Sequence, residues 1–363
     1  MPRFMEGDLV VTLGNVPRSA GRLEGARRVH LWLLLVLVLV SIASLAVGAS
    51  GTSLWGALDK LVNGQPLTRA EAVVLWDIRA PRLLMGICVG AALAVSGAVM
   101  QGLFRNPLAD PGIVGISAGA SLGAVLAIVM GGALAGLWPV ALQPFLVPAA
   151  AFLGAWAVTL ILYRVATRNG RTSVATMLLA GIAMTALAGA MMGILIFVAD
   201  DQQLRDLTFW TLGSLAGASW SKVATAGPLI LLALAVSASL GSALNGLALG
   251  EATAHHIGIP VQRMKNIAVL SVAAAAGAAV AVSGGIGFIG IVVPHLLRLW
   301  TGPDHRALLI NAALLGASLL LVADMISRVA IAPAELPIGI ITAVLGAPVF
   351  LWILLRKRGM VDL

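Results

Sequence analysis

The chain has 363 residues, of which 60% are hydrophobic and only 10% are charged, and its formal net charge is +8. Soluble domains carry roughly a quarter charged residues, so this composition excludes a soluble protein and indicates an all-α, polytopic membrane protein. The positive charge requires no nucleic-acid partner, because basic residues gather in the cytoplasmic loops of membrane proteins.

The predicted elements begin with an Arg-rich segment, residues 1–30, which we expect to be cytoplasmic. The apolar run after it exceeds that of a typical signal peptide, so we predict an uncleaved first span. A span needs about 20 apolar residues to cross roughly 30 Å of hydrocarbon. About ten such runs give a transmembrane domain over residues 31–356, followed by a cytoplasmic tail, 357–363. The predicted spans are 31–50, 82–104, 112–132, 146–165, 175–199, 226–245, 267–284, 286–300, 307–326 and 336–355.

The basic residues predict the orientation, because Lys and Arg are retained on the cytoplasmic side. With the N-terminus inside, 16 of the 23 basic residues lie on the cytoplasmic side, and both termini are cytoplasmic. The seven that then lie outside are Lys60, Arg69, Arg79, Arg82, Arg205, Lys222 and Arg328.

Two features predict how the spans pack. GAALAVSG at 90–97 reappears as GAAVAVSG at 277–284, in spans that run in opposite directions, which suggests an inverted repeat; similar small-residue composition is an equal alternative. Pro and Gly interrupt the chain at 105–121, 283–295 and 333–348. Irregular backbone at membrane depth needs cover from protein or a water-filled cavity, so these segments should lie inside the bundle or near a pathway.

The connection at 244–266, LNGLALGEATAHHIGIPVQRMKN, predicts short helices broken at Gly250 and Gly258. Its mixture of Ala, Leu and polar residues suits docking against a soluble partner, or else an amphipathic loop on the membrane surface. No Lys follows a Gly, so the phosphate-binding loop G-x-x-x-x-G-K is absent and the chain is not expected to be an ATPase or another enzyme.

Few side chains are candidates for metal or ion chemistry. Cys88 is the only cysteine, so we expect no disulfide and no metal cluster. Asp324 lies near the outer end of a predicted span, where pairing with a neighbour such as Arg328 is a commoner role than ion coupling. All five His and the lone Tyr163 fall toward the cytoplasmic side, so no haem ligand is expected in the outer half.

Met177, Met184 and Met191, with Met192 beside the last, recur at near-heptad spacing along the fifth predicted span. They predict either a soft, adaptable lining for a bulky apolar cargo or ordinary helix packing.

From about residue 50 to 356 the chain resembles the permease subunits of the FecCD family, type II ABC importers for ferric siderophores, haem and cobalamin. The resemblance rests on IRAPRLLMGICVGAALAVSGAVMQGLFRNPLADPGIVGISAGA, MLLAGIA, FWTLGSLAGASW, LALGEATAHHIGI, GGIGFIGIVVPHLLR, DHRALL, LLVADMISR and ELPIGIITAVLGAPVF. It implies a homodimer with ten helices per subunit in a bacterial inner membrane, two ATP-hydrolysing subunits and a periplasmic binding protein. No permanently bound cofactor is implied.

The resemblance also implies roles for particular residues. Arg79, Arg82 and Arg328 match outward-facing arginines that receive carboxylates from the binding protein, a task that suits the planar guanidinium; anchoring to lipid headgroups is the alternative. The residues that match the coupling helices in the ATPase cleft are Leu249, Gly250, Glu251, Ala254 and Gly258.

Ser173 and Val174 match the cytoplasmic gate, although Val174 and Ala175 depart from the small hydroxyl residues usual there. The stretch DLTFWTLGSLAGASW looks closest to haem permeases, which predicts haem as cargo. A ferric siderophore and cobalamin are the alternatives, and an ion-coupled secondary transporter or a passive channel is the alternative of a different class.

Overall fold

A computed structural model describes residues 19–48, 51–112, 114–134, 139–168 and 171–358. Helices make up most of this part of the chain, and each of the ten predicted spans coincides with one. Their bounds are α1 (Ser19–Ala46), α4 (Ala80–Phe104), α5 (Ile116–Leu134), α6 (Leu146–Ala166), α7 (Val174–Val198), α9 (Trp220–Ser239), α12 (Val261–Ser283), α13 (Ile289–Thr301), α14 (His305–Val329) and α15 (Ile338–Arg358). The all-α polytopic fold is therefore confirmed.

Seven of the described helices are long and apolar enough to cross a membrane, while the apolar parts of α5, α13 and α15 are shorter. The clearest difference from the predicted spans is α13. Its 13 residues rise only about 20 Å at 1.5 Å per residue, less than the hydrocarbon thickness. The reason is that α13 starts inside the bundle, after the irregular segment 284–288.

Short elements join the spans. Those at the ends of α4 and α9 are α2 (Leu54–Val62), α3 (Arg69–Ala72), the π-helix η1 (Val73–Arg79), α10 (Gly241–Ala248) and α11 (Glu251–His256). The 3-10 helix η3 (Val140–Phe145) precedes α6, and α8 (Asp201–Leu212) follows α7. An antiparallel hairpin, β1 (Thr167–Arg168) and β2 (Arg171–Thr172), lies between α6 and α7. The breaks predicted at Gly250 and Gly258 are confirmed, since both have positive φ and flank α11.

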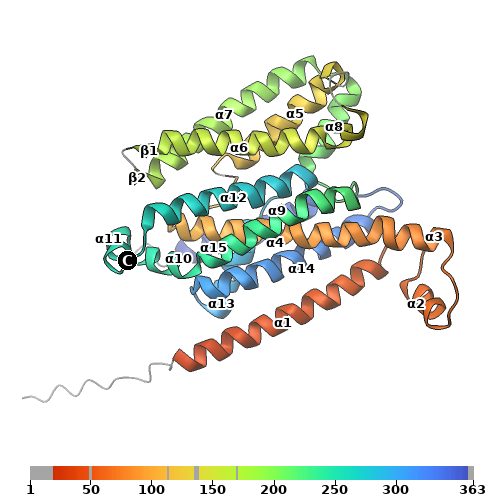
Figure 1. Ribbon diagram of the computed structural model, residues 1–363, viewed down its shortest axis with the longest axis horizontal. Helices are drawn as coiled ribbons and strands as arrows, with labels where there is room; N and C mark the ends of the chain where they lie inside the picture. Colours follow the sequence, from red (N-terminus) through yellow and green to blue (C-terminus); the bar gives the residue numbers. More distant parts are fainter. Residues whose placement is uncertain (1–18, 49–50, 113, 135–138, 169–170, 359–363) are drawn as a thin grey trace, which may run out of the picture.

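The bundle has two distinct ends (Figure 1). The start of α1, the hairpin and helices α10 and α11 lie at one end, which we call the α11 end. Helices α2, α3 and α8 lie at the opposite end, the α3 end. Helices α4 and α12, which carry the two copies of the repeated octapeptide, pack against each other and run in opposite directions. This is the relative direction that an inverted repeat requires.

The core is centred on α4, which contacts α9, α12, α13 and α14. Most of its side chains are buried, and small residues allow the close approach. A methyl group at Gly90 would overlap the backbone of Gly316, and one at Gly97 would overlap the backbone of Gly290. Helix α7 is the contrast, because only Met177, Gly181 and Ala188 are buried in the single chain and most of its other residues are exposed.

Of the interrupted segments, 284–288 lies inside the bundle, as predicted, whereas Pro333, Ala334 and Glu335 are exposed, so the start of 333–348 does not lie inside the bundle. Gly284 and Phe288 have positive φ. The backbone of residues 210–214 forms hydrogen bonds with the backbone next to and within this segment. The Gly285 N–H donates to the Trp210 carbonyl, and the Ser214 N–H donates to the Ser283 carbonyl at 2.8 Å. Backbone that leaves the helix at this depth is therefore satisfied by protein.

Candidate functional site

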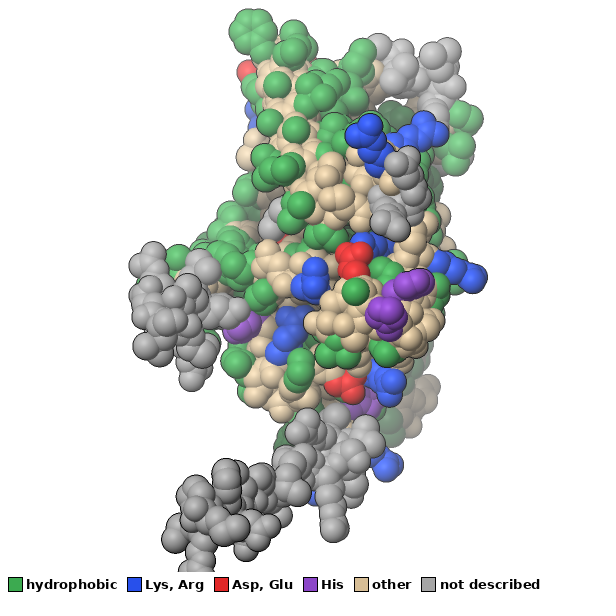
Figure 2. Space-filling view, turned by 90° about the vertical axis from the view of Figure 1, so that its left-hand side faces the viewer, with side chains coloured by type: hydrophobic (Ala, Val, Ile, Leu, Met, Phe, Trp, Pro, Cys, Tyr) green, Lys and Arg blue, Asp and Glu red, His purple; other side chains and the backbone are tan. Residues whose placement is uncertain are grey.

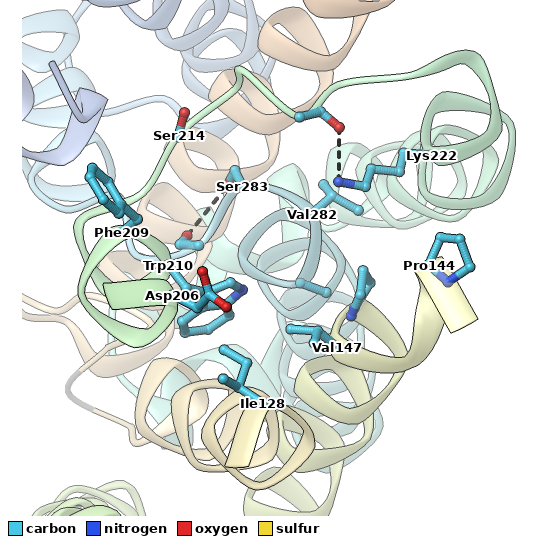
Figure 3. A pocket seen from close by; sticks show the side chains of 14 residues that line it. Ile128, Pro144, Val147, Asp206, Phe209, Trp210, Ser214, Lys222, Val282 and Ser283 are labelled. Atoms are coloured by element: carbon cyan, nitrogen blue, oxygen red, sulfur yellow. Dashed lines mark hydrogen bonds between the residues drawn. The ribbon is translucent and has the colours of Figure 1, made fainter. Parts of the chain in front are cut away.

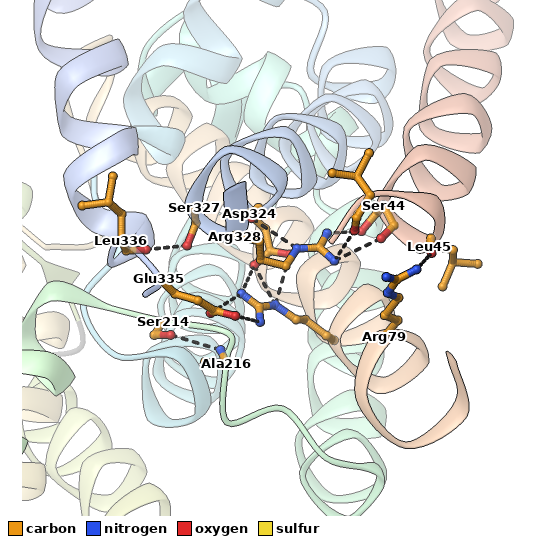
Figure 4. Close-up of polar contacts among 12 residues, drawn as sticks. Ser44, Leu45, Arg79, Ser214, Ala216, Asp324, Ser327, Arg328, Glu335 and Leu336 are labelled. Carbon is orange, nitrogen blue, oxygen red and sulfur yellow. Dashed lines mark hydrogen bonds and ion pairs between the residues drawn. The ribbon is translucent and has the colours of Figure 1, made fainter. Parts of the chain in front are cut away.

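The α3 end carries a buried charge network built from α4, α14 and the segment before α15 (Figure 4). The carboxylate of Asp324 is fully buried, and it accepts a hydrogen bond from Arg82 Nε at 2.9 Å. The same carboxylate pairs with Arg328 Nε at 3.1 Å, which confirms the predicted Asp324–Arg328 pairing. Arg82 uses its other two nitrogens on Glu335, donating to each carboxylate oxygen at 2.9 Å. Such two-pronged pairing fixes geometry as well as charge.

Two of the arginines also hold the end of α1. The last carbonyls of a helix have no partners within it. Arg79 Nη1 donates to the Leu45 carbonyl at 2.6 Å, and Arg328 Nη1 donates to the Ser44 carbonyl at 3.1 Å. Arg328 Nη2 adds a bond to Ser44 Oγ at 2.9 Å. The guanidinium charges lie at the negative end of the helix dipole, where cations are favoured.

The three predicted docking arginines thus lie together, but not as exposed side chains. Arg79, Arg82 and Arg328 are only 4%, 4% and 6% exposed. Burial follows because each guanidinium finds carboxylates or carbonyls of its own chain. With Glu335 and Gly48 they line a cavity of about 290 Å³, whose most accessible charged group is Glu335, with 36% of its side chain exposed. The docking role stays a prediction.

Sequence reasoning missed Glu335 and Ser44. Glu335 lies 253 residues from Arg82 in the chain, so no local pattern connects them. The available signal was the acidic residue in ELPIG, directly after the Pro-rich turn at 333.

The α11 end presents the predicted coupling residues. Leu249 is 68% exposed and Ile257 is 59% exposed, so α11 is flanked by apolar side chains that face outward. Glu251 is exposed, Gly258 takes a positive φ, and Ala254 is fully buried beneath them. Figure 2 looks onto this end, where basic, His and a few acidic side chains surround the short helices.

The predicted gate lies beside this end. Ser173 is exposed and caps α7, since its Oγ accepts the Thr176 N–H at 3.3 Å. Val174 is half-buried against the core. Met177, one turn further, is fully buried, Met184 is half-buried and Met191 is exposed. The three methionines therefore do not share one environment, and their lining role stays a prediction.

A larger cavity of about 400 Å³ opens near the α3 end between α5, α6, α8, α9 and α12 (Figure 3). Its wall includes residues of the α8 region, namely Asp206, Phe209, Trp210, Ser214 and Gly217, which all belong to the stretch DLTFWTLGSLAGASW. Lys222 also faces it and donates to the Gly217 carbonyl at 2.8 Å. Apolar walls with a few polar groups, at this volume, are typical of small-molecule sites.

The model of the FecCD transport family matches residues 33–356, nearly the whole chain. The chain belongs to the FecCD transport family. It is 46% identical to the hemin transport system permease HmuU of Yersinia pestis over 331 residues, which are 90% of this chain and 95% of that protein. It is 42% identical to the vitamin B12 import system permease BtuC of Shigella boydii over 327 residues, again 90% and 95%.

A solved structure of an ABC transporter of the metal-chelate type, in an inward-facing conformation, also matches this FecCD chain. The TM-score is 0.79 at 30% identity, over 91% of this chain and 99% of that one. The chain is thus a membrane permease of the ABC importer type and not itself an enzyme.

Proposed function

We propose that this chain is the permease subunit of an ATP-driven importer of haem, working with a separate ATPase and an extracytoplasmic binding protein. The observation that carries the mechanism is the α11 end. There, Leu249 and Ile257 expose apolar side chains around a short, glycine-bounded helix, in a FecCD chain without a phosphate-binding loop. Apolar anchors rimmed by polar groups are typical of a docking surface for another protein.

The α11 end is then cytoplasmic, which agrees with the distribution of Lys and Arg. Both chain termini lie on that side of a bacterial inner membrane. The α3 end faces outward, and the cavity lined by Arg79, Arg82 and Arg328 receives carboxylates of the binding protein. Arg82 already pairs with Glu335. A carboxylate of the binding protein must therefore replace the Glu335 carboxylate in order to bind Arg82.

A homodimer is the proposed assembly, with α7 in its interface. Helix α7 leaves large apolar side chains exposed, including Leu179, Ile194 and Phe197. Lipid also covers such faces, so the dimer is supported by the family rather than by this face alone.

Haem is the proposed cargo because the stretch that resembles haem permeases forms part of the wall of the cavity near the α3 end. The hemin permease of Y. pestis is 46% identical and the vitamin B12 permease of S. boydii 42%. A ferric siderophore and cobalamin remain second candidates, since this difference in identity is small.

The mechanism is tested by reconstituting the chain with its ATPase in liposomes, with ATP on the α11 side and loaded binding protein on the α3 side. Uptake should require ATP, the ATPase and the binding protein together. Gly258→Arg should abolish it, because the side chain would protrude from the docking surface at a positive φ. Uptake driven by an ion gradient without ATP would overturn the proposal in favour of a secondary transporter.

A further inference from the structure

A buried lysine joins the α11 end to the segment before α7. Lys265 lies in the second turn of α12 and is 4% exposed, which is rare for lysine unless its charge is paired. Its Nζ donates to Glu251 Oε1 on α11 at 2.7 Å and to the Thr172 carbonyl on β2 at 3.0 Å. One ammonium group thus holds three segments together.

Thr172 is fixed at each of its polar groups. Its N–H donates to Gln262 Oε1 on α12 at 2.9 Å, and its hydroxyl accepts from Gln262 Nε2 at 2.5 Å. Lys265 Nζ donates a hydrogen bond to the Thr172 carbonyl. The next residue, Ser173, caps α7, so a displacement of Thr172 displaces the first turn of α7 with it.

Within its own chain, helix α7 has few contacts that oppose such a displacement, and only the proposed dimer interface would add to them. In the single chain it contacts α5 and α6, and of the residues in its most apolar window only 11% are buried. A helix with few buried contacts shifts at lower cost than one packed on all sides.

We propose that Lys265 is the positioning residue that transmits movement of α11 to Thr172 and the start of α7. This inference rests on the proposed function, in which the ATPase docks at the α11 end, and on the family resemblance, which implies that residues 173–174 form the gate. Glu251 is the exposed end of the link, half of it open to a docked partner, and Thr172 is its buried end.

The test uses Lys265→Met and Lys265→Arg in the reconstituted complex. Met has similar length and no charge. It leaves the Thr172 carbonyl without this donor, but the only charge it leaves behind is that of Glu251, which is exposed, so no buried charge is left unpaired. Arg keeps donors for both partners. We expect cargo moved per ATP hydrolysed to fall about tenfold or more with Met, because a charged hydrogen bond is lost, and to be largely retained with Arg.

A second readout follows the gate directly. Cys88 is the only cysteine, so Cys88→Ser with Ser173→Cys gives one reporter thiol at an exposed position. Its reaction rate with a polar thiol reagent should change when the ATPase is trapped with ATP, and Lys265→Met should remove that change. Lys60→Met is the matched control, because Lys60 pairs with Glu71 at 2.7 Å at the opposite end; it should alter neither readout.

Three results would overturn the inference. One is an unchanged transport-to-ATP ratio in Lys265→Met, and another is an unchanged response of the S173C thiol in the same variant. The third is an equal loss of the transport-to-ATP ratio in Lys265→Met and Lys265→Arg, which indicates a packing role. Absence of ATP-driven uptake in the native complex, by contrast, refutes the proposed function itself.

Discussion

Replacing Asp324 with Asn should destabilise the folded chain more than any other single change in the network at the α3 end. The Asp324 carboxylate is fully buried and balances two guanidinium groups, Arg82 at 2.9 Å and Arg328 at 3.1 Å. Asn keeps the size and removes the charge, so the substitution isolates electrostatics from packing.

The magnitude follows from what remains around each arginine. Removing one partner of a buried ion pair costs about 3–5 kcal/mol, because the other charge is left uncompensated. Arg82 still has Glu335, and Arg328 still has the Ser44 carbonyl, so the lower end of that range, about 3 kcal/mol, is expected. Glu335→Gln should cost about 1 kcal/mol or less, since its side chain is 36% exposed.

The assay is equilibrium unfolding of both variants in detergent micelles, followed by tryptophan fluorescence, with native chain as reference. Reversibility must be shown first, because irreversible unfolding reports a rate instead of a free energy. If Glu335→Gln destabilises as much as Asp324→Asn, or if Asp324→Asn has no effect, the central role given to the Asp324 carboxylate is refuted.

Three further outcomes are expected. Glu335→Gln should tighten docking of the binding protein severalfold in a pull-down titration, because the Arg82 fork is freed; weaker docking contradicts the exchange. Gly97→Ala should lower stability and expression, because the added methyl overlaps α13, whereas Gly132→Ala, with nothing within 4 Å, should be tolerated. Asp304→Ala should cost about 1 kcal/mol at pH 7 by removing the cap of α14. Burial opposes ionisation of Asp304, but hydrogen bonds from Asn245 and the α14 backbone outweigh it and hold its pKa below the ordinary 3.8. The ionised cap therefore stabilises the fold above pH 3.8, and this stabilisation is lost as the pH falls through the lowered pKa. The difference in the free energy of unfolding between Asp304→Ala and the native chain should shrink over that range; a difference that does not change with pH contradicts this.

Much of the fold could be predicted because the length of an apolar run can be read from one continuous stretch of the sequence. Each apolar run of sufficient length forms a helix, and the glycines at 250 and 258 break the chain where predicted. The segment 201–212 was missed, because α8 follows α7 after a short break and its sequence is too polar for a span. Helix α13 was overestimated, because the irregular turn at 284–288 depends on the carbonyl of the distant residue Trp210.

The candidate site was predicted in its residue types but not in its environment. Positive charge at 79, 82 and 328 indicated outward-facing cations, whereas the structure buries them against carboxylates and helix-end carbonyls. Asp324 and Arg328 could be paired in advance, because they lie one helical turn apart. The pairing of Arg82 with Glu335, and of Lys265 with Thr172, joins residues far apart in the chain, so only the assembled bundle reveals it.

The measurement that tests the central claim most directly is ATP-dependent uptake into liposomes holding this chain with its ATPase. Haem, a ferric siderophore and cobalamin are offered separately on their binding protein. The account predicts haem uptake that needs both ATP and the binding protein. Siderophore or cobalamin uptake without haem uptake would contradict the cargo, and haem uptake without ATP would contradict the mechanism.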